Sequence, residues 1–480
     1  MNYERTRSLV NSVWDESVMP ALLEYLRIPC KSPIFDPHWR ENGFLDRAVA
    51  LIECWSRARL ATGVTIERLC APDRTPLVLI DVPGSSCGCV LIYGHLDKQP
   101  EASGWRDGFG PWTPVVEEDK LYGRGSVDDG YAAFASVVAI LALRDQNIAH
   151  PRCVILIECC EESGSVDLPF YLDLLAERRG TPNLVICLDS GAGDYNRLWI
   201  TTSLRGIVLG TLTVQTIREA VHSGDASGIV PSSFRISRQL ISRLEDEKTG
   251  TILASQFHVT IPQERWNEAA RAAQAVGDDV YVRFPFLDGV EPISKDITEL
   301  IINRTWRPAL SITGAAGIPS LEGAANVLLP AMAVRFSFRL PPTCPAHVAG
   351  NDLKTLLEVN PPYRARVCFN IEHCTSGWNS ERLDEWLLRS VDEASSVFFG
   401  KAAAYIGEGG SIPSISTLAH RFAGAQFLIT GVMGPHSNAH GSNECLDLQA
   451  VKKLTCCVAH VLADMSATYP DEMAAETQHE

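Results

Sequence analysis

The stretch CVLIYGHLDKQP, residues 89–100, shows how this chain is built. A short apolar run ends on a glycine, and a histidine and an aspartate follow where the run stops. Runs of the same kind predict four strands, at Leu77–Val82, Cys89–Tyr93, Val154–Glu158 and Leu184–Leu188. Helical patterns lie between them at Tyr131–Arg144 and Leu168–Arg178. This alternation is typical of an α/β layer structure.

The overall composition is that of an ordinary globular protein. The chain has 480 residues, of which 46% are hydrophobic and 21% charged, and its formal net charge is −16. This composition excludes a fibrous or disordered chain. An acidic surface repels phosphate backbones, so we expect no nucleic-acid partner.

Neither a membrane span nor a secretion signal is expected. The longest mostly apolar stretch, Tyr131–Leu143, is shorter than the roughly 20 residues that a bilayer requires. The N-terminal stretch MNYERTRSLVNSVWDE mixes charges of both signs and lacks an apolar signal core. The 15 cysteines contain no CxxC pair. We therefore expect a cytoplasmic protein without a membrane partner.

The pattern changes after about Ser203. Gly206–Ile217 predicts a strand, and Pro231–Glu245 predicts a helix that begins on a proline. Ala331–Leu340 alternates apolar and polar residues, which indicates a half-exposed antiparallel strand. We expect a smaller α+β unit, residues 204–380, inserted between two parts of one domain, residues 1–203 and 381–480. The tail after Pro470 is polar enough to be disordered.

Metal-ligand residue types gather in a few short segments, most of them directly after predicted strands. The segments are YGHLD (93–97), GRGSVDDG (123–130), ECCEESGS (158–165), LDSG (188–191) and, far downstream, NAHGSNE (438–444). Strand ends face the ligand crevice in open α/β sheets. Singly, each segment has a structural explanation, such as a hydrogen-bonded histidine, helix-capping carboxylates or a solvated acidic loop. Together they indicate a bound positive charge that balances them.

Histidine nitrogen and carboxylate oxygen are ligands of zinc and similar divalent ions. Five such groups around two ions, one carboxylate being shared, would leave positions for water and substrate, as two-metal hydrolysis requires. Such a reaction also needs a general base, and one of Glu161 and Glu162 is free for it. The HxD spacing suits Asp97 for orienting the imidazole of His95.

The five segments resemble, in order, the motifs of metallopeptidase family twenty, which includes carnosinase-type dipeptidases, aminoacylases and glutamate carboxypeptidases. The resemblance spans nearly the whole chain, because SLRGI at Ser203, VHSG at Val221, FSFRLPP at Phe336 and EGGSIP at Glu408 are also similar to family segments. It implies a mixed-sheet catalytic domain with helices on both faces, and an inserted lid and dimerisation domain. It also implies a homodimer.

The same resemblance implies specific roles at a dinuclear site. His95, Asp128 and Asp189 would hold one ion, and Asp128, Glu162 and His440 the other, with Asp128 bridging. Glu161 would be the general base, Asp97 would orient His95, and Asp128-Asp129 would be joined by a cis peptide bond. Zinc is the expected metal, with manganese or cobalt as alternatives.

Residues outside the metal site would bind substrate. The resemblance implies that His222 crosses to the partner subunit and stabilises the oxyanion. Arg339 would clamp a substrate carboxylate. Ser411, Asn326 and His373 would complete substrate binding.

The expected reaction is hydrolysis of the amide bond in a dipeptide or a similar small, carboxylate-bearing amide. Within the family, Asp at the position of Asp189 accompanies dipeptidases and aminopeptidases, whereas Glu accompanies carboxypeptidases and deacylases. The alternative on the same scaffold is an N-acyl-amino-acid amidohydrolase or a carboxypeptidase. His436 departs from the family pattern, and we expect it at the rim of the site, in a loop with His440.

Other classes fit the sequence less well. Gly123-x-Gly125 suggests a dinucleotide-binding oxidoreductase, but Asp128 occupies the place of the third glycine and would repel a pyrophosphate. A serine hydrolase around Ser411 lacks the second glycine of a nucleophile elbow. A metal-free binding protein on this scaffold is disfavoured because every expected ligand is present.

Overall fold

The four strands predicted in the first 200 residues lie together in one sheet of the computed structural model, which describes residues 1–60 and 63–468. The sheet has the order β1-β2-β6-β3-β7-β17. Its strands are β1 (Thr65–Leu69), β2 (Leu77–Val82), β3 (Cys89–His95), β6 (Arg152–Glu158), β7 (Leu184–Cys187) and β17 (Gln426–Ile429). β6, β3, β7 and β17 pair in parallel, and β2 pairs antiparallel with both neighbours, so the sheet is mixed. The tail after Pro470 lies outside the described residues.

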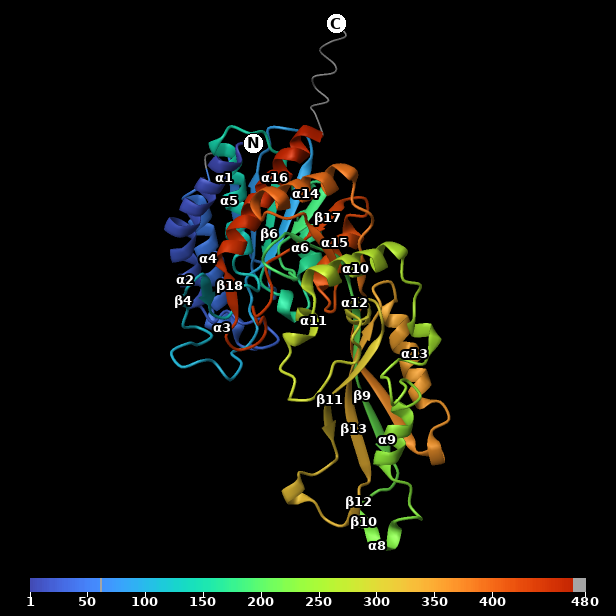
Figure 1. The fold of residues 1–480 in the computed structure, drawn as a ribbon. Coiled ribbons are helices and arrows are strands. Elements are labelled where there is room, and N and C mark those ends of the chain that lie inside the picture. The colour runs from blue at the N-terminus through green and yellow to red at the C-terminus, as the bar shows by residue number, and fades with distance from the viewer. Residues whose placement is uncertain (61–62, 469–480) are drawn as a thin grey trace.

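Helices cover both faces of this sheet (Figure 1). Alternate residues of β3 belong to different apolar clusters: Val90 and Ile92 pack on one face, Leu91 and Tyr93 on the other. The first face is covered by α1 (Tyr3–Val13), α2 (Met19–Leu26), α4 (Phe44–Arg57), α5 (Ala132–Asp145), α14 (Glu385–Phe398) and α16 (Leu448–Thr468). The second is covered by α6 (Leu168–Leu174) and α15 (Pro413–Arg421). The predicted fold class is confirmed.

Two small sheets hold the distant C-terminal segments against this layer. One pairs β18 (Cys445–Asp447) with β5 (Lys120–Tyr122), which pairs with β4 (Val115–Glu117). The other joins β8 (Trp199–Leu204) to β15 (Trp378–Asn379) and β16 (Ala404–Glu408). The first of these sheets brings the loop that contains His440 beside the segment that contains Asp128.

A second unit extends away from the first and contains a four-stranded antiparallel sheet (Figure 1). Its order is β11 (Ala309–Ala316), β13 (Ala331–Leu340), β9 (Gly206–Gln215) and β14 (Arg366–Thr375). As the alternation of β13 predicts, Phe336 and Phe338 are buried, and they pack against α9 (Ser233–Ile241) and α13 (Ala346–Glu358). The tip farthest from the first unit holds β10 (Val221–His222), α8 (Ser223–Ala226) and β12 (Val327–Leu328).

Three helices from the middle of the insertion pack against the small sheet of β8 and β16. They are α10 (Gln263–Val276), α11 (Asp279–Val282) and α12 (Ile297–Thr305). Their apolar residues, such as Ala269 and Ile302, form one buried cluster with Trp199 and Ile406. The insertion therefore contributes packing to both units, and the division at residues 203 and 380 stays a prediction.

The helix boundaries differ from the predictions in small ways. The helix predicted at Leu168–Arg178 is divided at Leu175 into α6 and α7 (Ala176–Arg179). The helix predicted from Pro231 begins at Ser233, because the side chain of Ser232 caps it by accepting a hydrogen bond from the Arg235 amide. A short helix, α3 (Trp39–Asn42), precedes α4. Among the described residues, none of the helices combines the length and the apolar character that crossing a bilayer requires.

Candidate active site

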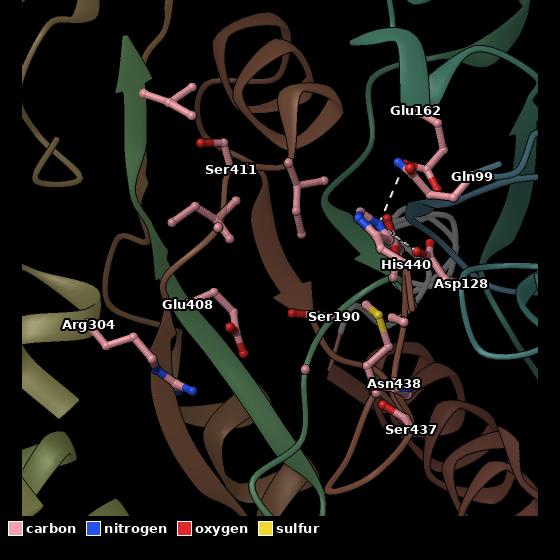
Figure 2. Close-up of a pocket in the computed structure, with 18 of the residues that line it drawn as sticks. Gln99, Asp128, Glu162, Ser190, Arg304, Glu408, Ser411, Ser437, Asn438 and His440 are labelled. Carbon is pink, nitrogen blue, oxygen red and sulfur yellow. Dashed lines mark hydrogen bonds and ion pairs between the residues drawn. The ribbon is translucent and has the colours of Figure 1, made fainter. Parts of the chain in front are cut away.

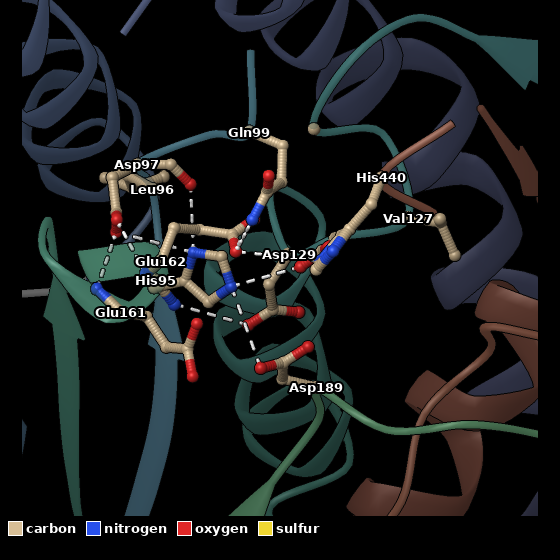
Figure 3. A network of polar contacts seen from close by, with 12 residues as sticks. His95, Leu96, Asp97, Gln99, Val127, Asp129, Glu161, Glu162, Asp189 and His440 are labelled. Carbon is tan, nitrogen blue, oxygen red and sulfur yellow. Dashed lines mark hydrogen bonds and ion pairs between the residues drawn. The ribbon is translucent and has the colours of Figure 1, made fainter. Parts of the chain in front are cut away.

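The predicted ligands meet at the carboxyl ends of the central strands. His95 is the last residue of β3, Glu161 and Glu162 form a turn just after β6, and Asp189 follows β7. These three strands run parallel, so their ends share one edge of the sheet. Asp128 enters from the loop before α5, and Figure 3 shows His440 approaching from the opposite side.

The side chains form two groups that share Asp128. In the first, Nε2 of His95 lies 3.2 Å from Oδ1 of Asp128 and 3.7 Å from Oδ2 of Asp189. In the second, Nε2 of His440 lies 2.9 Å from Oδ2 of Asp128 and 3.6 Å from Oε2 of Glu162. Within each group the ligand atoms all lie within 4.8 Å of one another. Each Asp128 oxygen faces a different group, which is the geometry of a bridging carboxylate.

The site concentrates negative charge in the protein interior. Asp128, Asp189, Glu161 and Glu162 are buried or nearly so. Burial raises the pKa of Asp189 to about 6, and burial together with neighbouring carboxylates raises the pKa values of Glu161 and Glu162 well above normal. At Asp128 burial acts in the same direction, but the hydrogen bonds from His440 and His95 outweigh it and lower the pKa.

Three crowded carboxylates, those of Asp128, Asp189 and Glu162, together with two histidines are a donor set that suits divalent cations such as zinc. Oε1 of Glu162 is buried without a hydrogen-bond partner among the described residues, as expected for an oxygen aimed at a ligand. The residues present therefore fit a pair of metal ions.

Asp97 and Gln99 form hydrogen bonds that position the proposed metal-ligand residues. The Asp97 carboxylate accepts hydrogen bonds from the backbone amides of Glu161 (3.1 Å) and Glu162 (3.0 Å). Nδ1 of His95 lies 3.0 Å from the carbonyl oxygen of Asp97 and 3.5 Å from its carboxylate, so the carbonyl is the nearer acceptor. The Gln99 amide donates to Oε2 of Glu162 (Figure 3). The segment that follows β3 thus fixes the turn that contains Glu161 and Glu162.

A buried ion pair joins the two loops that meet at Asp128. Nη1 of Arg124 lies 2.7 Å from Oε2 of Glu444, and both side chains are almost completely buried. Oε1 of Glu444 accepts from the amides of Gly125 and Val127, and Nη2 of Arg124 donates to the carbonyl of Gly441. The peptide bond Asp128-Asp129 is cis, as predicted. This network sets the position of His440 relative to Asp128.

A cavity of about 1210 Å³ opens in front of the ligand groups and reaches the sheet of the second unit (Figure 2). Arg339 and His373 line its far side, on β13 and β14. Nη1 of Arg339 lies 3.4 Å from Oγ of Ser411, and Nε2 of His373 lies 2.6 Å from Oγ1 of Thr375. His436 is exposed at the rim in the loop that also contains His440, as expected.

Two predicted residues lie far from this cavity. His222 is at the tip of the second unit, with its side chain 67% exposed, and it lies 3.8 Å from Asp225 (Figure 1). The carbonyl of Asn326 accepts a hydrogen bond from the Ser223 amide, so Asn326 lies beside His222. The fold brings these two residues together, but it does not bring them to the ligand groups of the same chain.

Sequence reasoning missed several residues that shape the site. Gln99, Arg124 and Glu444 lie inside the quoted motifs, where an amide or a charge next to predicted ligands was the available signal. Arg283 and Arg304, which line the cavity, lie in segments without any motif. Their place in the cavity follows from the packing of α10–α12 and could not be deduced from local sequence.

The fold and the paired ligand groups define an α/β metallohydrolase architecture, and the comparisons identify its family. The profile described as peptidase family M20/M25/M40 matches residues 91–464. The chain belongs to this peptidase family, which confirms the predicted family and the prediction of a hydrolase.

Relatives and solved structures agree with this assignment. The chain is 23% identical to a cysteinylglycine-S-conjugate dipeptidase of Corynebacterium striatum, over 85% of this chain and 88% of the relative. It is 28% identical to the human Beta-Ala-His dipeptidase, over 68% of this chain and 66% of that protein. The structure of the dipeptidase Dug1p of Saccharomyces cerevisiae superposes with a TM-score of 0.75 at 20% identity, over 97% of this chain and 99% of that one. Human carnosine dipeptidase 1 gives a TM-score of 0.74 at 20% identity, with the same coverage.

Proposed function

We propose that this protein is a dinuclear metal-dependent dipeptidase that cleaves the amide bond of dipeptides or similar small amides bearing a carboxylate. The observation that supports this most directly is Asp128, whose two oxygens face two separate ligand groups at the floor of a cavity. The dipeptidases among the relatives favour this reaction over N-acyl-amino-acid hydrolysis.

We assign one ion to His95, Asp128 and Asp189, and the other to Asp128, Glu162 and His440. Zinc is the expected metal, because its preferred ligands are these nitrogen and oxygen atoms, with manganese or cobalt as alternatives. Bound there, the ions would supply Lewis-acid chemistry that activates a water and polarises a carbonyl.

Glu161 is the proposed general base. It lines the cavity but belongs to neither ligand group, and its backbone is fixed by Asp97. Burial raises its pKa well above the usual range, which suits a carboxylate that accepts a proton from the attacking water and passes it to the leaving amine. Arg339 and Ser411, 3.4 Å apart, offer donors to the substrate carboxylate.

The Glu161→Gln variant tests the proposed base. It keeps the size of the side chain, so metal content measured by elemental analysis should match the wild type. Dipeptide turnover should fall by a factor of roughly 10² to 10⁴. Glu177→Gln, on the exposed surface of α7, is the matched control. Wild-type turnover in the Glu161→Gln variant would remove Glu161 from the mechanism.

His222 is proposed to act in the active site of a partner subunit, where it would donate a hydrogen bond to the oxyanion. A homodimer, located in the cytoplasm, is part of this proposal. The dimer is supported by the exposure of the His222 side chain at a tip of the second unit, far from the cavity of its own chain.

Mixing two inactive variants tests the dimer. When His222→Ala and Glu161→Gln chains are unfolded and refolded together in equal amounts, mixed dimers contain one site with both native residues. The mixture should recover about a quarter of wild-type activity, because half of the dimers are mixed. Absence of any recovery from a mixture shown to contain mixed dimers would contradict a role in trans.

A further inference from the structure

Several guanidinium groups lie along the cavity wall that faces the ligand groups. Arg283, Arg304 and Arg339 line the cavity, and Arg205 lies behind them between β8 and β9. Figure 2 shows Arg304 and Glu408 on one side of the cavity, with Ser190 between them and the pair Asp128 and His440. This wall and the metal site would therefore contact different parts of one substrate.

These arginines differ in whether the N–H groups of their guanidinium already have hydrogen-bond acceptors in the protein. Arg205 donates to the backbone carbonyls of Gly409 (3.0 Å), Arg307 (3.3 Å) and Asn303 (3.4 Å), so it is part of the scaffold. Arg304 packs along Gly409, and its Nε is buried with no hydrogen-bond partner among the described residues. The guanidinium of Arg283 lies 4.9 Å from the ring of its neighbour Phe284, at the cavity mouth. Arg283 and Arg304 therefore have donors available for a ligand.

The positive charge of this wall is only partly balanced, because Glu408 is the one carboxylate that acts on both Arg283 and Arg205 within the part of the chain that the structure describes. Glu408 and Asp279 also line the cavity, but within the part of the chain that the structure describes neither forms an ion pair within 4 Å with Arg283 or Arg304, so Glu408 acts on Arg283 from a longer distance. Partial desolvation in the cavity and then repulsion from Arg304 lower the pKa of Arg283, although its side chain is exposed at the mouth and Glu408 opposes the shift. Burial, followed by Arg339 and Arg304, lowers the pKa of Arg205 to about 9. A cationic wall in a chain of net charge −16 is a local feature that an anionic ligand would stabilise.

We infer that Arg304 and Arg283 form a second anion subsite, which binds an additional carboxylate of the substrate beside the carboxylate held by Arg339. The preferred substrates are then dipeptides with an acidic side chain. This inference rests on the proposed dipeptidase function and narrows its substrate class. A guanidinium pairs with a carboxylate through charge-assisted hydrogen bonds, which discriminate strongly against a neutral amide of the same shape.

Matched substrate pairs test this subsite. Glu-Ala carries a side-chain carboxylate before the cleaved bond, and Gln-Ala is its neutral amide partner. Ala-Glu carries the carboxylate after the cleaved bond, and Ala-Gln is its neutral partner. The two pairs therefore also show which residue of the dipeptide the subsite binds. In the wild type, kcat/KM for the acidic member should exceed that of its amide by about tenfold in at least one pair, mainly through KM. Arg304→Gln should reduce this ratio to near one, and Arg283→Gln should reduce it in the same direction.

Arg271→Gln, an exposed residue of α10, is the control and should keep the wild-type ratio. Equal kcat/KM for both members of each pair in the wild type would overturn the inference. So would a wild-type ratio in the Arg304→Gln variant, which would show that Arg304 does not bind the additional carboxylate of the substrate.

A binding measurement distinguishes failure of this inference from failure of the proposed function. If no dipeptide is cleaved, the proposed function fails, whereas the subsite is still tested by calorimetry of zinc-loaded Glu161→Gln protein with the same four dipeptides. Tighter binding of an acidic dipeptide than of its amide, lost in the Glu161→Gln/Arg304→Gln double variant, would support the subsite. Equal affinities, or binding of none of the four, would overturn it.

Discussion

The Glu158→Gln substitution should stabilise the protein, relative to wild type, increasingly as the pH rises from 4.5 to 8. Glu158 ends β6 beneath the active site and is completely buried. Its Oε1 accepts a hydrogen bond of 2.6 Å from the hydroxyl of Tyr93. Burial, and after it the nearby charge of Asp97, raises the pKa of this carboxyl from 4.5 to about 7. A glutamine keeps an acceptor for Tyr93 and cannot ionise.

The size and sign of the effect follow from this shift. The pKa is raised on folding, so the stabilising effect of the neutral carboxyl is complete below pH 4.5 and is lost as the pH rises through 7. A rise of about 2.5 pKa units corresponds to about 3 kcal/mol at pH 8. Because the group is completely buried, no discount for solvent screening applies. The free energy of unfolding of the glutamine variant minus that of the wild type should therefore be larger at pH 8 than at pH 4.5, by up to about 3 kcal/mol.

Urea denaturation of both proteins at pH 4.5 and pH 8, with metal removed by a chelator, measures this difference. Glu177→Gln, on the exposed surface of α7, controls for loss of a carboxyl as such and should show no pH-dependent gain. A stability difference between Glu158→Gln and wild type that is the same at both pH values would refute the reasoning.

Two further substitutions probe the framework of the site, and a third probes the apolar core beneath the helices. Arg124→Leu leaves the carboxylate of Glu444 buried and unpaired, so denaturation should show a loss of about 3–5 kcal/mol, while a conserved midpoint would contradict this. Asp97→Ala removes the acceptor of two amides in the Glu161 turn, so zinc affinity measured by competition with a chelator should fall by roughly 10- to 100-fold. Trp14→Ala removes a completely buried ring whose Nε1 donates to Thr455, and thermal or urea denaturation should show a loss of about 3–5 kcal/mol.

The sequence predicted the central sheet well because its strands are continuous apolar runs. Burial on both faces makes every residue of β3 buried, and such a run stands out without any knowledge of its neighbours. The strand is longer than predicted and includes His95, because its pairing with β6 continues to Glu158. The C-terminal end of β3 is set by its register with β6, and the register of a strand cannot be deduced from its own apolar sequence.

The residues of the two proposed ligand groups could be predicted because each lies in a recognisable motif, and His95, Glu162 and Asp189 also lie at or just after the end of such a run. The residues that line the opposite wall could not. Arg304 reaches the cavity because α12 packs on β16 through Ile302 and Ile406, and this contact joins segments about one hundred residues apart. Likewise, His222 lies in a motif but far from the cavity of its own chain, so its proposed role would depend on a second subunit.

Metal stoichiometry tests the central claim most directly. Zinc-saturated, gel-filtered protein analysed for metal should contain two ions per chain, and His440→Ala should contain one, because His440 belongs to one ligand group. Asp128→Ala should retain close to none, because Asp128 belongs to both groups. One ion or none in the wild type, or two in a folded Asp128→Ala variant, would contradict the bridged site.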